Sequence, residues 1–266
     1  MCGQLVTEAG KTNLRKGTVI VMTDIHCHIL PDIDDGASDM GESIKMARMA
    51  YDSGVTELAA TPHFFGEEES LGLLAQIKEG LDSFRRALSA EGIPLTVYSG
   101  AEILCTEETP VLAQMRCLPT IGDGRYALCE FYFDESVRTM EYVLGAIKRE
   151  GYIPVVAHPE RYEDIQRDPE IIGNWFEHGI IIQVNRGSLL GRFGQASEEA
   201  ADYILSHGLA HAIASDAHSS RMRTPYLADI KRYAVESFGA DYAKILLSEN
   251  PARILRGKRV VSPYEL

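Results

Sequence analysis

The sequence predicts a single α/β domain folded as a closed barrel of seven β/α units. Three observations predict it. Short apolar runs alternate with helix-period segments, no linker or internal repeat divides the 266 residues, and every apolar run ends in a polar side chain. Short strands that are apolar throughout are typical of a parallel sheet buried on both faces. Either a closed barrel or an open doubly wound sheet fits the first two observations; the third decides between them.

The elements follow one another regularly along the chain. Strands are predicted at residues 18–24, 55–61, 95–102, 126–131, 152–158, 179–185 and 210–218. Helices are predicted between and after them, at residues 42–54, 68–90, 108–115, 136–151, 169–178, 197–207, 226–238 and 240–248. Asp39 is a suitable N-cap for the first of these helices, and Gly54 ends it. Seven strands are therefore expected, each followed by helical chain.

The polar groups at the strand ends favour closure into a barrel. In chain order they are His26, His63, Glu102, Glu130, His158, Asn185 and Asp216, and six of these seven could bind a metal. Active sites of β/α folds lie at the carboxyl ends of the strands. An open sheet uses the few strands at its switch point, whereas a barrel gathers all its strand ends around one mouth. Six ligand-type ends therefore favour the barrel.

Neighbouring residues enlarge this set to five histidines and four carboxylates. The candidate metal ligands are His26, His28, Asp35, His63, Glu102, Glu130, His158, Asp216 and His218. Imidazole and carboxylate donors suit Zn, Mn or Fe. One zinc ion needs about four ligands, so nine could hold two or three ions with bridging carboxylates. Three divalent ions against four carboxylates leave a positive cavity, which suits an anionic substrate such as a phosphate ester.

Composition narrows the class of protein. The formal net charge is −13, so binding to nucleic acid is not expected. The five cysteines are irregularly spaced without a CxxC pair, which favours a reducing compartment over a disulfide framework. No apolar run approaches the length of a membrane span or a signal-peptide core. We therefore expect a cytoplasmic protein that does not insert into membranes; its oligomeric state cannot be predicted from the sequence.

Seven motifs carry a resemblance to a known family: DIHCHILPDIDDGA, AATPHF, GAEI, YALCEF, VVAHPERY, QVNRGSLLGRFG and IASDAHSSRMR. They resemble the PHP (polymerase and histidinol phosphatase) superfamily, and within it the bacterial metal-dependent tyrosine-protein phosphatases of capsular and exopolysaccharide biosynthesis. The resemblance covers residues 22 to about 225. It implies a distorted, TIM-barrel-like (β/α)7 barrel, a cluster of two or three divalent ions of the Mn²⁺ type, and hydrolysis of phosphotyrosine. The implied substrate is the tyrosine-rich tail of a bacterial tyrosine kinase.

The resemblance carries over to individual residues. The nine candidate ligands match the family motifs, with Asp35 chosen over Asp32 and Asp34 because it directly precedes Gly36. Arg161 and Arg223 match family arginines, and a guanidinium could grip a phosphate with two hydrogen bonds. A metal-bound hydroxide is the expected nucleophile. The sequence departs from the family at Phe64 and Arg186, either of which could alter the rim of the pocket.

Other functions are weighed against this hypothesis. A cysteine phosphatase needs an arginine six residues after its nucleophile, and none of the five cysteines has one. Strand alternation turns Cys27 away from its histidine neighbours, into packing. The remaining alternatives are a PHP phosphoesterase that acts on a small ester such as histidinol phosphate, and a non-catalytic metal-binding regulator. Residues 1–21 are expected to be an extension, disordered or loosely docked, before a single domain at 22–266.

Overall fold

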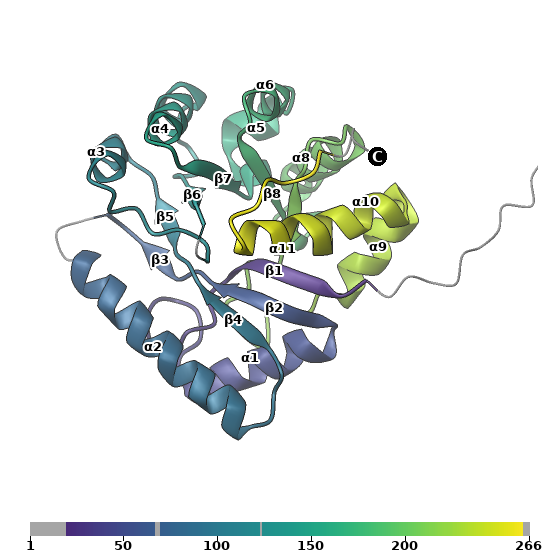
Figure 1. Cartoon of the computed structure of the whole chain (residues 1–266). Coiled ribbons are helices and arrows are strands. Elements are labelled where there is room, and N and C mark those ends of the chain that lie inside the picture. The colour runs from purple at the N-terminus through teal and green to yellow at the C-terminus, as the bar shows by residue number, and fades with distance from the viewer. Residues whose placement is uncertain (1–19, 67–69, 123, 263–266) are drawn as a thin grey trace, which may run out of the picture.

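All strands of the computed structural model pair in parallel, with helices around them (Figure 1). The structure describes residues 20–66, 70–122 and 124–262; nearly all of the expected extension 1–21 lies outside them. The strands are β1 (Met22–Cys27), β2 (Val55–Ala60), β3 (His63–Phe64), β4 (Thr96–Ser99), β5 (Glu102–Leu104), β6 (Tyr126–Glu130), β7 (Ile153–Ala157), β8 (Ile181–Asn185) and β9 (Ala212–Ala214).

The strands form two sheets that together make a distorted ring. One sheet has the order β1-β2-β4 and the other β3-β5-β6-β7-β8-β9. The chain passes directly from β2 into β3 and from β4 into β5. At both places it leaves the first sheet and enters the second. A parallel bridge between Cys27 and Ala217 joins β1 to the chain after β9, and the His28 amide donates to the Ala217 carbonyl at 2.8 Å. Seven parallel passes of the chain are thus arranged around one axis, but the described strands are split between two sheets and form no continuous closed barrel, which corrects the predicted closure.

Two predicted strands, 55–61 and 95–102, are interrupted where the chain changes sheets. Pro62 separates β2 from β3 and lacks the amide that a ladder needs. Gly100 separates β4 from β5, and a Cβ at this position would lie 2.9 Å from the Thr61 side chain. The absence of a side chain at Gly100 therefore lets the two kinked segments pass close together.

Helices follow the strands, and those before α11 cover the outside of the ring. They are α1 (Met40–Asp52), α2 (Ser70–Ala90), α3 (Thr109–Gln114), α4 (Val137–Arg149), α5 (Glu163–Arg167), α6 (Ile171–Glu177), α7 (Arg186–Leu189), α8 (Gln195–Ser206), α9 (Ala228–Phe238), α10 (Ala240–Lys244) and α11 (Asn250–Leu255). Asp39 caps α1 by accepting from the Glu42 amide at 2.9 Å, as predicted. None of the helices that the structure describes is long and apolar enough to cross a membrane.

The core has two layers, one outside and one inside the ring. The outer layer packs helices on strands and includes Met46, Phe84 and Ile147. The inner layer joins small residues of the strands, such as Ala59, to Ile254 of α11. In Figure 1, α11 crosses the middle of the ring. It belongs to one apolar cluster with Tyr126, the first residue of β6, and so covers the amino end of the ring with apolar side chains.

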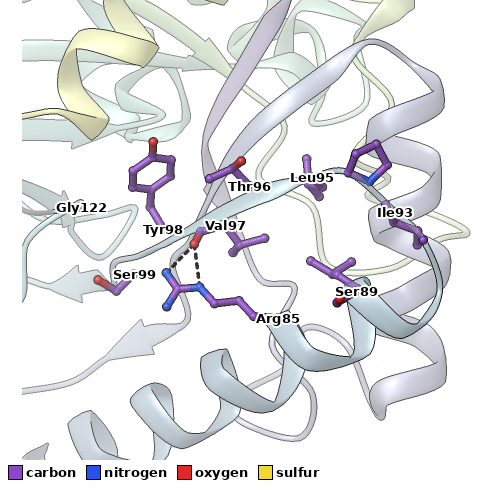
Figure 2. Close-up of a pocket in the computed structure, with 12 residues that line it drawn as sticks. Arg85, Ser89, Ile93, Leu95, Thr96, Val97, Tyr98, Ser99 and Gly122 are labelled. Carbon is purple, nitrogen blue, oxygen red and sulfur yellow. Dashed lines mark hydrogen bonds between the residues drawn. The ribbon is translucent and has the colours of Figure 1, made fainter.

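A hollow of about 700 Å³ marks the split in the ring, along the edge of β4 (Figure 2). Arg85 of α2 reaches across this edge, and its Nε and Nη2 donate to the Val97 carbonyl at 3.0 and 2.6 Å. The Gly122 amide donates to the Ser99 carbonyl at 2.7 Å. These contacts occupy acceptors of an otherwise open strand edge, which limits pairing with other chains.

Candidate metal centre

Nine ligand-type side chains converge where the strands end at their carboxyl side. Their ligand atoms form four overlapping groups, with the atoms of each group within 4.8 Å of one another: His28, Asp35, His63 and His218; His26, His28 and Glu102; His26, His158 and Asp216; and His63, Glu102 and Glu130. Together these groups contain every residue that the sequence predicts as a ligand. The residues come from most strands of the ring, as expected for a site at a barrel mouth.

Glu102 lies at the centre of this cluster. Its Oε2 is 3.1 Å from Nε2 of His26 and 3.2 Å from Nε2 of His28. Its Oε1 is 3.1 Å from Nε2 of His158. One carboxylate therefore faces three imidazoles with both of its oxygens.

The chemistry and burial of the cluster fit divalent cations. Glu102, His158 and Asp216 are each 1% exposed, and burying carboxylates at such a depth is costly unless positive charge compensates them. Asp216 Oδ1 and His158 Nδ1 are buried without a hydrogen-bond partner among the described residues. Imidazoles and carboxylates together suit Mn, Fe or Zn.

Burial and neighbouring charges shift the pKa values within the cluster in both directions, and burial together with the charge of His28 lowers that of His218 to about 3. Burial lowers the pKa of His26, but the carboxylates of Glu102 and Asp216 outweigh burial and raise this pKa to about 9. Burial and the charge of Glu102 raise the pKa of Glu130 to about 8. Protons are therefore held where divalent ions could bind, and metal binding should release them.

Two further side chains fix the orientation of the first two histidines. Nδ1 of His26 lies 2.9 Å from Oε1 of Gln183, and Nδ1 of His28 lies 2.6 Å from Oδ2 of Asp34. These contacts leave both Nε2 atoms turned toward the cluster, 3.2 Å apart. Such partners fix the tautomer and ring orientation of metal-binding histidines.

The sequence missed both orienting residues. Asp34, passed over in favour of Asp35, also accepts from the His63 amide at 3.0 Å. The signal for Gln183 was its polarity within the apolar run of β8, two residues before the strand-end Asn185.

Backbone strain accompanies two of the converging residues. His158 has φ 33° and Asp216 has φ 49°, both in the left-handed region. Residues other than glycine rarely adopt this backbone conformation, and such strained residues are often found at functional sites. In both cases the chain turns sharply at the end of a strand, which directs the side chain back over the mouth.

Asp35 lies at the outer side of the cluster. It is 66% exposed, and its Oδ1 is 3.3 Å from Nε2 of His63 and 3.4 Å from Nε2 of His218. A cavity of about 630 Å³ opens beside it and reaches Arg221 and the amino end of α1. The cluster is thus accessible to solvent on this side.

The two predicted arginines lie against Asp216. Arg223 contacts Asp216 Oδ2 directly, and its Nη1 is 3.2 Å from Nε2 of His218. Nη1 of Arg161 is 3.7 Å from the same Oδ2. Asn185, the remaining strand-end residue, donates from Nδ2 to this oxygen at 2.5 Å. Positive charge therefore gathers beside the cluster, where an anion could bind.

A family model described as capsular polysaccharide synthesis, CpsB/CapC, matches residues 22–256. The chain belongs to this family. Among curated relatives, tyrosine-protein phosphatase YwqE of Bacillus subtilis is 35% identical over 90% of this chain and 93% of its own length. Tyrosine-protein phosphatase CpsB of Streptococcus pneumoniae is 30% identical over 88% of this chain and 98% of its own.

Solved structures of this family and of distant proteins agree with the fold. One match is a crystal structure from work on YwqE of Bacillus subtilis and CpsB of Streptococcus pneumoniae, described there as metal-dependent tyrosine phosphatases. It has a TM-score of 0.83 and 34% identity, and the match covers 91% of this chain and 97% of that one. An amidohydrolase from Mycoplasma synoviae matches with a TM-score of 0.54 at 14% identity, which shows likeness of fold alone. The PHP-type α/β fold expected from the sequence is thereby confirmed.

The residues that depart from the CpsB/CapC pattern, and Cys27, lie away from the rim. Phe64 is 2% exposed and packs in the outer core. Arg186 is buried and pairs with Asp229, with Nε at 2.8 Å from Oδ1. Neither side chain lines the cavity beside the cluster. Cys27 packs in the outer core while His26 and His28 face the cluster, as alternation predicted.

Proposed function

We propose that this member of the CpsB/CapC family is a metal-dependent protein-tyrosine phosphatase. The observation that carries the proposal is the convergence of nine ligand-type side chains beside two guanidinium groups. The names of relatives aligned over nearly their whole length supply the substrate class, phosphotyrosine in proteins. The nine converging residues are the proposed ligands of two or three divalent ions, with Mn²⁺ as the first choice.

Each part of the site has a role in the proposed hydrolysis. Bound divalent ions would supply a water of lowered pKa and neutralise charge on the phosphate. Gln183 and Asp34 hold the imidazoles of His26 and His28 with Nε2 toward the ions. Glu102, buried at the centre of the cluster, and Asp35, on its solvent side, would be among the residues that hold the ions.

The arginines would bind the phosphate oxygens. The guanidinium groups of Arg161 and Arg223 both approach one oxygen of Asp216, at the edge of the cluster. Guanidinium groups donate two parallel hydrogen bonds to a phosphate and stabilise the charge of an in-line transition state. The leaving tyrosinate has a pKa of about 10, so a strong general acid is unnecessary.

The cellular setting is part of the same proposal. A capsule-linked family and a phosphotyrosine substrate together suggest the tail of a bacterial tyrosine kinase that regulates capsular or exopolysaccharide synthesis. A kinase tail of this kind would be met in the cytoplasm. We place the catalytic unit in residues 22–266, as a single domain.

Metal analysis paired with substrate comparison tests the proposal. The protein is purified without added metal, its metal content is measured, and a phosphotyrosine peptide is offered after loading with Mn²⁺, Fe²⁺ or Zn²⁺. We expect at least two ions per chain and turnover of the peptide. Histidinol phosphate is the matched small ester, and a preference for it by orders of magnitude would overturn the assignment. A regulator without activity would leave both substrates intact whatever metal is added.

A further inference from the structure

We propose that Phe133 and Phe193 are positioning residues that hold the Arg161 guanidinium at the metal centre for phosphate binding. These two phenylalanines are called the aromatic clamp below. The inference rests on the proposed phosphatase function. It extends that function to two side chains that can neither bind a metal ion nor transfer a proton. It concerns how one arginine is kept ready before a substrate arrives.

Both rings of the aromatic clamp face the guanidinium of Arg161. Its central carbon Cζ lies 4.4 Å from the centre of the Phe133 ring and 4.3 Å from the centre of the Phe193 ring. A cation over an aromatic face is attracted by the ring within about 6 Å. Phe133 follows β6, and Phe193 lies between α7 and α8. Two separate segments of the chain thus converge on one side chain.

Arg161 lacks the polar anchors that hold the neighbouring arginine. Its Nη1 is 3.7 Å from Asp216 Oδ2, beyond hydrogen-bond distance, and its guanidinium donates no hydrogen bond to any residue in the described part of the chain. Arg223 instead contacts Asp216 directly, and its Cζ is 5.8 Å from the Phe193 ring. The aromatic clamp is therefore the main restraint on Arg161, and it leaves the N–H groups available for an anion.

The ring of Phe193 rests on a glycine that has no room for a side chain. A Cβ added at Gly187 would lie 2.4 Å from Cε2 of Phe193. The Gly187 amide donates to Oδ1 of Asn185 at 2.8 Å, and Asn185 also donates to Asp216. Gly187 is thus held in place through Asn185, and the Phe193 ring packs directly against it. This contact fixes the position of the ring that faces Arg161.

This arrangement suits recognition of phosphate. An arginine side chain has many rotamers, and fixing it on binding costs conformational entropy. Aromatic faces restrict the guanidinium without occupying its donors, whereas a carboxylate partner would compete with the phosphate for them. The aromatic clamp should therefore raise affinity for the phosphate group itself, independently of the rest of the substrate.

Leucine substitutions in the aromatic clamp test the proposal. Inorganic phosphate binding to the metal-loaded protein is measured by calorimetry, beside KM and kcat for a phosphotyrosine peptide. For Phe133→Leu and Phe193→Leu we expect the phosphate Kd to rise roughly 2- to 30-fold, with unchanged metal content. Phe133→Tyr keeps an aromatic face and should bind phosphate like the wild type. Tyr142→Leu, on the exposed side of α4, is the control for loss of a surface aromatic residue.

A double-mutant cycle separates positioning from general structure. In an Arg161→Ala background, Phe133→Leu should cause no further loss of phosphate affinity, because the Phe133 ring faces only Arg161 among the described arginines. Gly187→Ala should reproduce the effect of Phe193→Leu, because it displaces the same ring. An equal loss from Phe133→Leu with and without Arg161 would overturn the proposal, as would a Phe133→Tyr protein as weak as Phe133→Leu.

Failure of this inference is distinguishable from failure of the proposed function. Phosphate binding needs no turnover, so the aromatic clamp is judged by affinity even if the wild type leaves phosphotyrosine peptides intact, which would overturn the function. If the wild type hydrolyses the peptide and both leucine variants bind phosphate as it does, the aromatic clamp alone is rejected.

Discussion

The two ends of the barrel differ in the kind of side chain that they bury. At the carboxyl end of the strands, Glu102, His158 and Asp216 are buried although burial disfavours charge. At the amino end, Ile254 and Leu255 of α11 are buried against apolar strand residues. Burial stabilises the second region and is costly in the first. The difference teaches that one end carries the chemistry and the other carries the stability, a division known from other β/α barrels.

The largest expected effect is loss of activity at the mouth. Asp216→Asn keeps the shape of the side chain but removes its charge, and kcat/KM for a phosphotyrosine peptide should fall about 1,000-fold, because metal-assisted stabilisation of the transition state is worth several kcal/mol. Urea unfolding of the metal-free variant separates this loss of activity from the loss of stability caused by removing the charge beside Arg223. Wild-type activity in this variant would remove Asp216 from the metal centre.

The matching change at the closed end should give the reverse result. Leu255→Ala removes a side chain that is 1% exposed, so the free energy of unfolding should fall by about 2–5 kcal/mol. Activity per folded molecule should stay at the wild-type level. Val111→Ala, on the exposed face of α3, is the control, with a change within about 0.5 kcal/mol. A Leu255→Ala protein with the wild-type free energy of unfolding but a lower kcat would contradict the division of roles between the two ends.

The strand ends show what could be predicted from the sequence. Parallel strands bring their carboxyl ends to one edge, so a polar residue at the end of each apolar run was enough to gather His26, Glu102 and Asp216 in one place. Asp35 was placed by its position before Gly36 and lies within reach of two histidines. These residues could be predicted because their positions depend mainly on strand direction.

Features that depend on contacts between distant segments escaped prediction. The helix α11 starts at Asn250 after a π-helical turn, whereas the predicted helix stopped at residue 248. Its role as a cover for the barrel arises only through packing. The aromatic clamp likewise joins two loops, and neither Phe133 nor Phe193 belongs to a periodic pattern. Local pattern therefore revealed the ligand-type residues but not what supports them.

A smaller effect is expected from the residue that orients His28. Burial raises the pKa of Asp34, but its hydrogen bond with His28 outweighs burial and holds this pKa at about 2. Asp34→Asn should weaken metal affinity by roughly 10- to 100-fold, measured by competition with a chelator. Asp32→Asn, in the same loop and exposed, should bind metal normally. Equal metal affinities in the two variants would contradict the role of Asp34 in orienting His28.

The smallest effect concerns acid stability away from the mouth. Burial lowers the pKa of His211 from its usual 6.5 to about 4, while its Nδ1 accepts from the Ile182 amide at 3.1 Å. The unfolded chain takes up the proton first, so the stability contributed by neutral His211 is present above pH 6.5 and is lost as the pH falls toward 4. Between pH 7 and 5 the loss should be about 2 kcal/mol.

His211→Asn supplies the control for this acid window. Its amide oxygen could accept from Ile182 and does not titrate, so unfolding of this variant should vary less with pH between 7 and 5. A wild-type protein equally stable at both values would contradict the assigned pKa of His211.

Reconstitution of the metal-stripped protein tests the central claim most directly. Mn²⁺ is added in steps while bound metal, melting temperature and phosphotyrosine-peptide turnover are followed together. We predict that activity returns as two or more ions bind per chain, that the melting temperature rises in parallel, and that Asp216→Asn shows neither response. Full turnover by the stripped protein, or bound metal without any return of activity, would contradict the assignment of the barrel mouth as a catalytic metal centre.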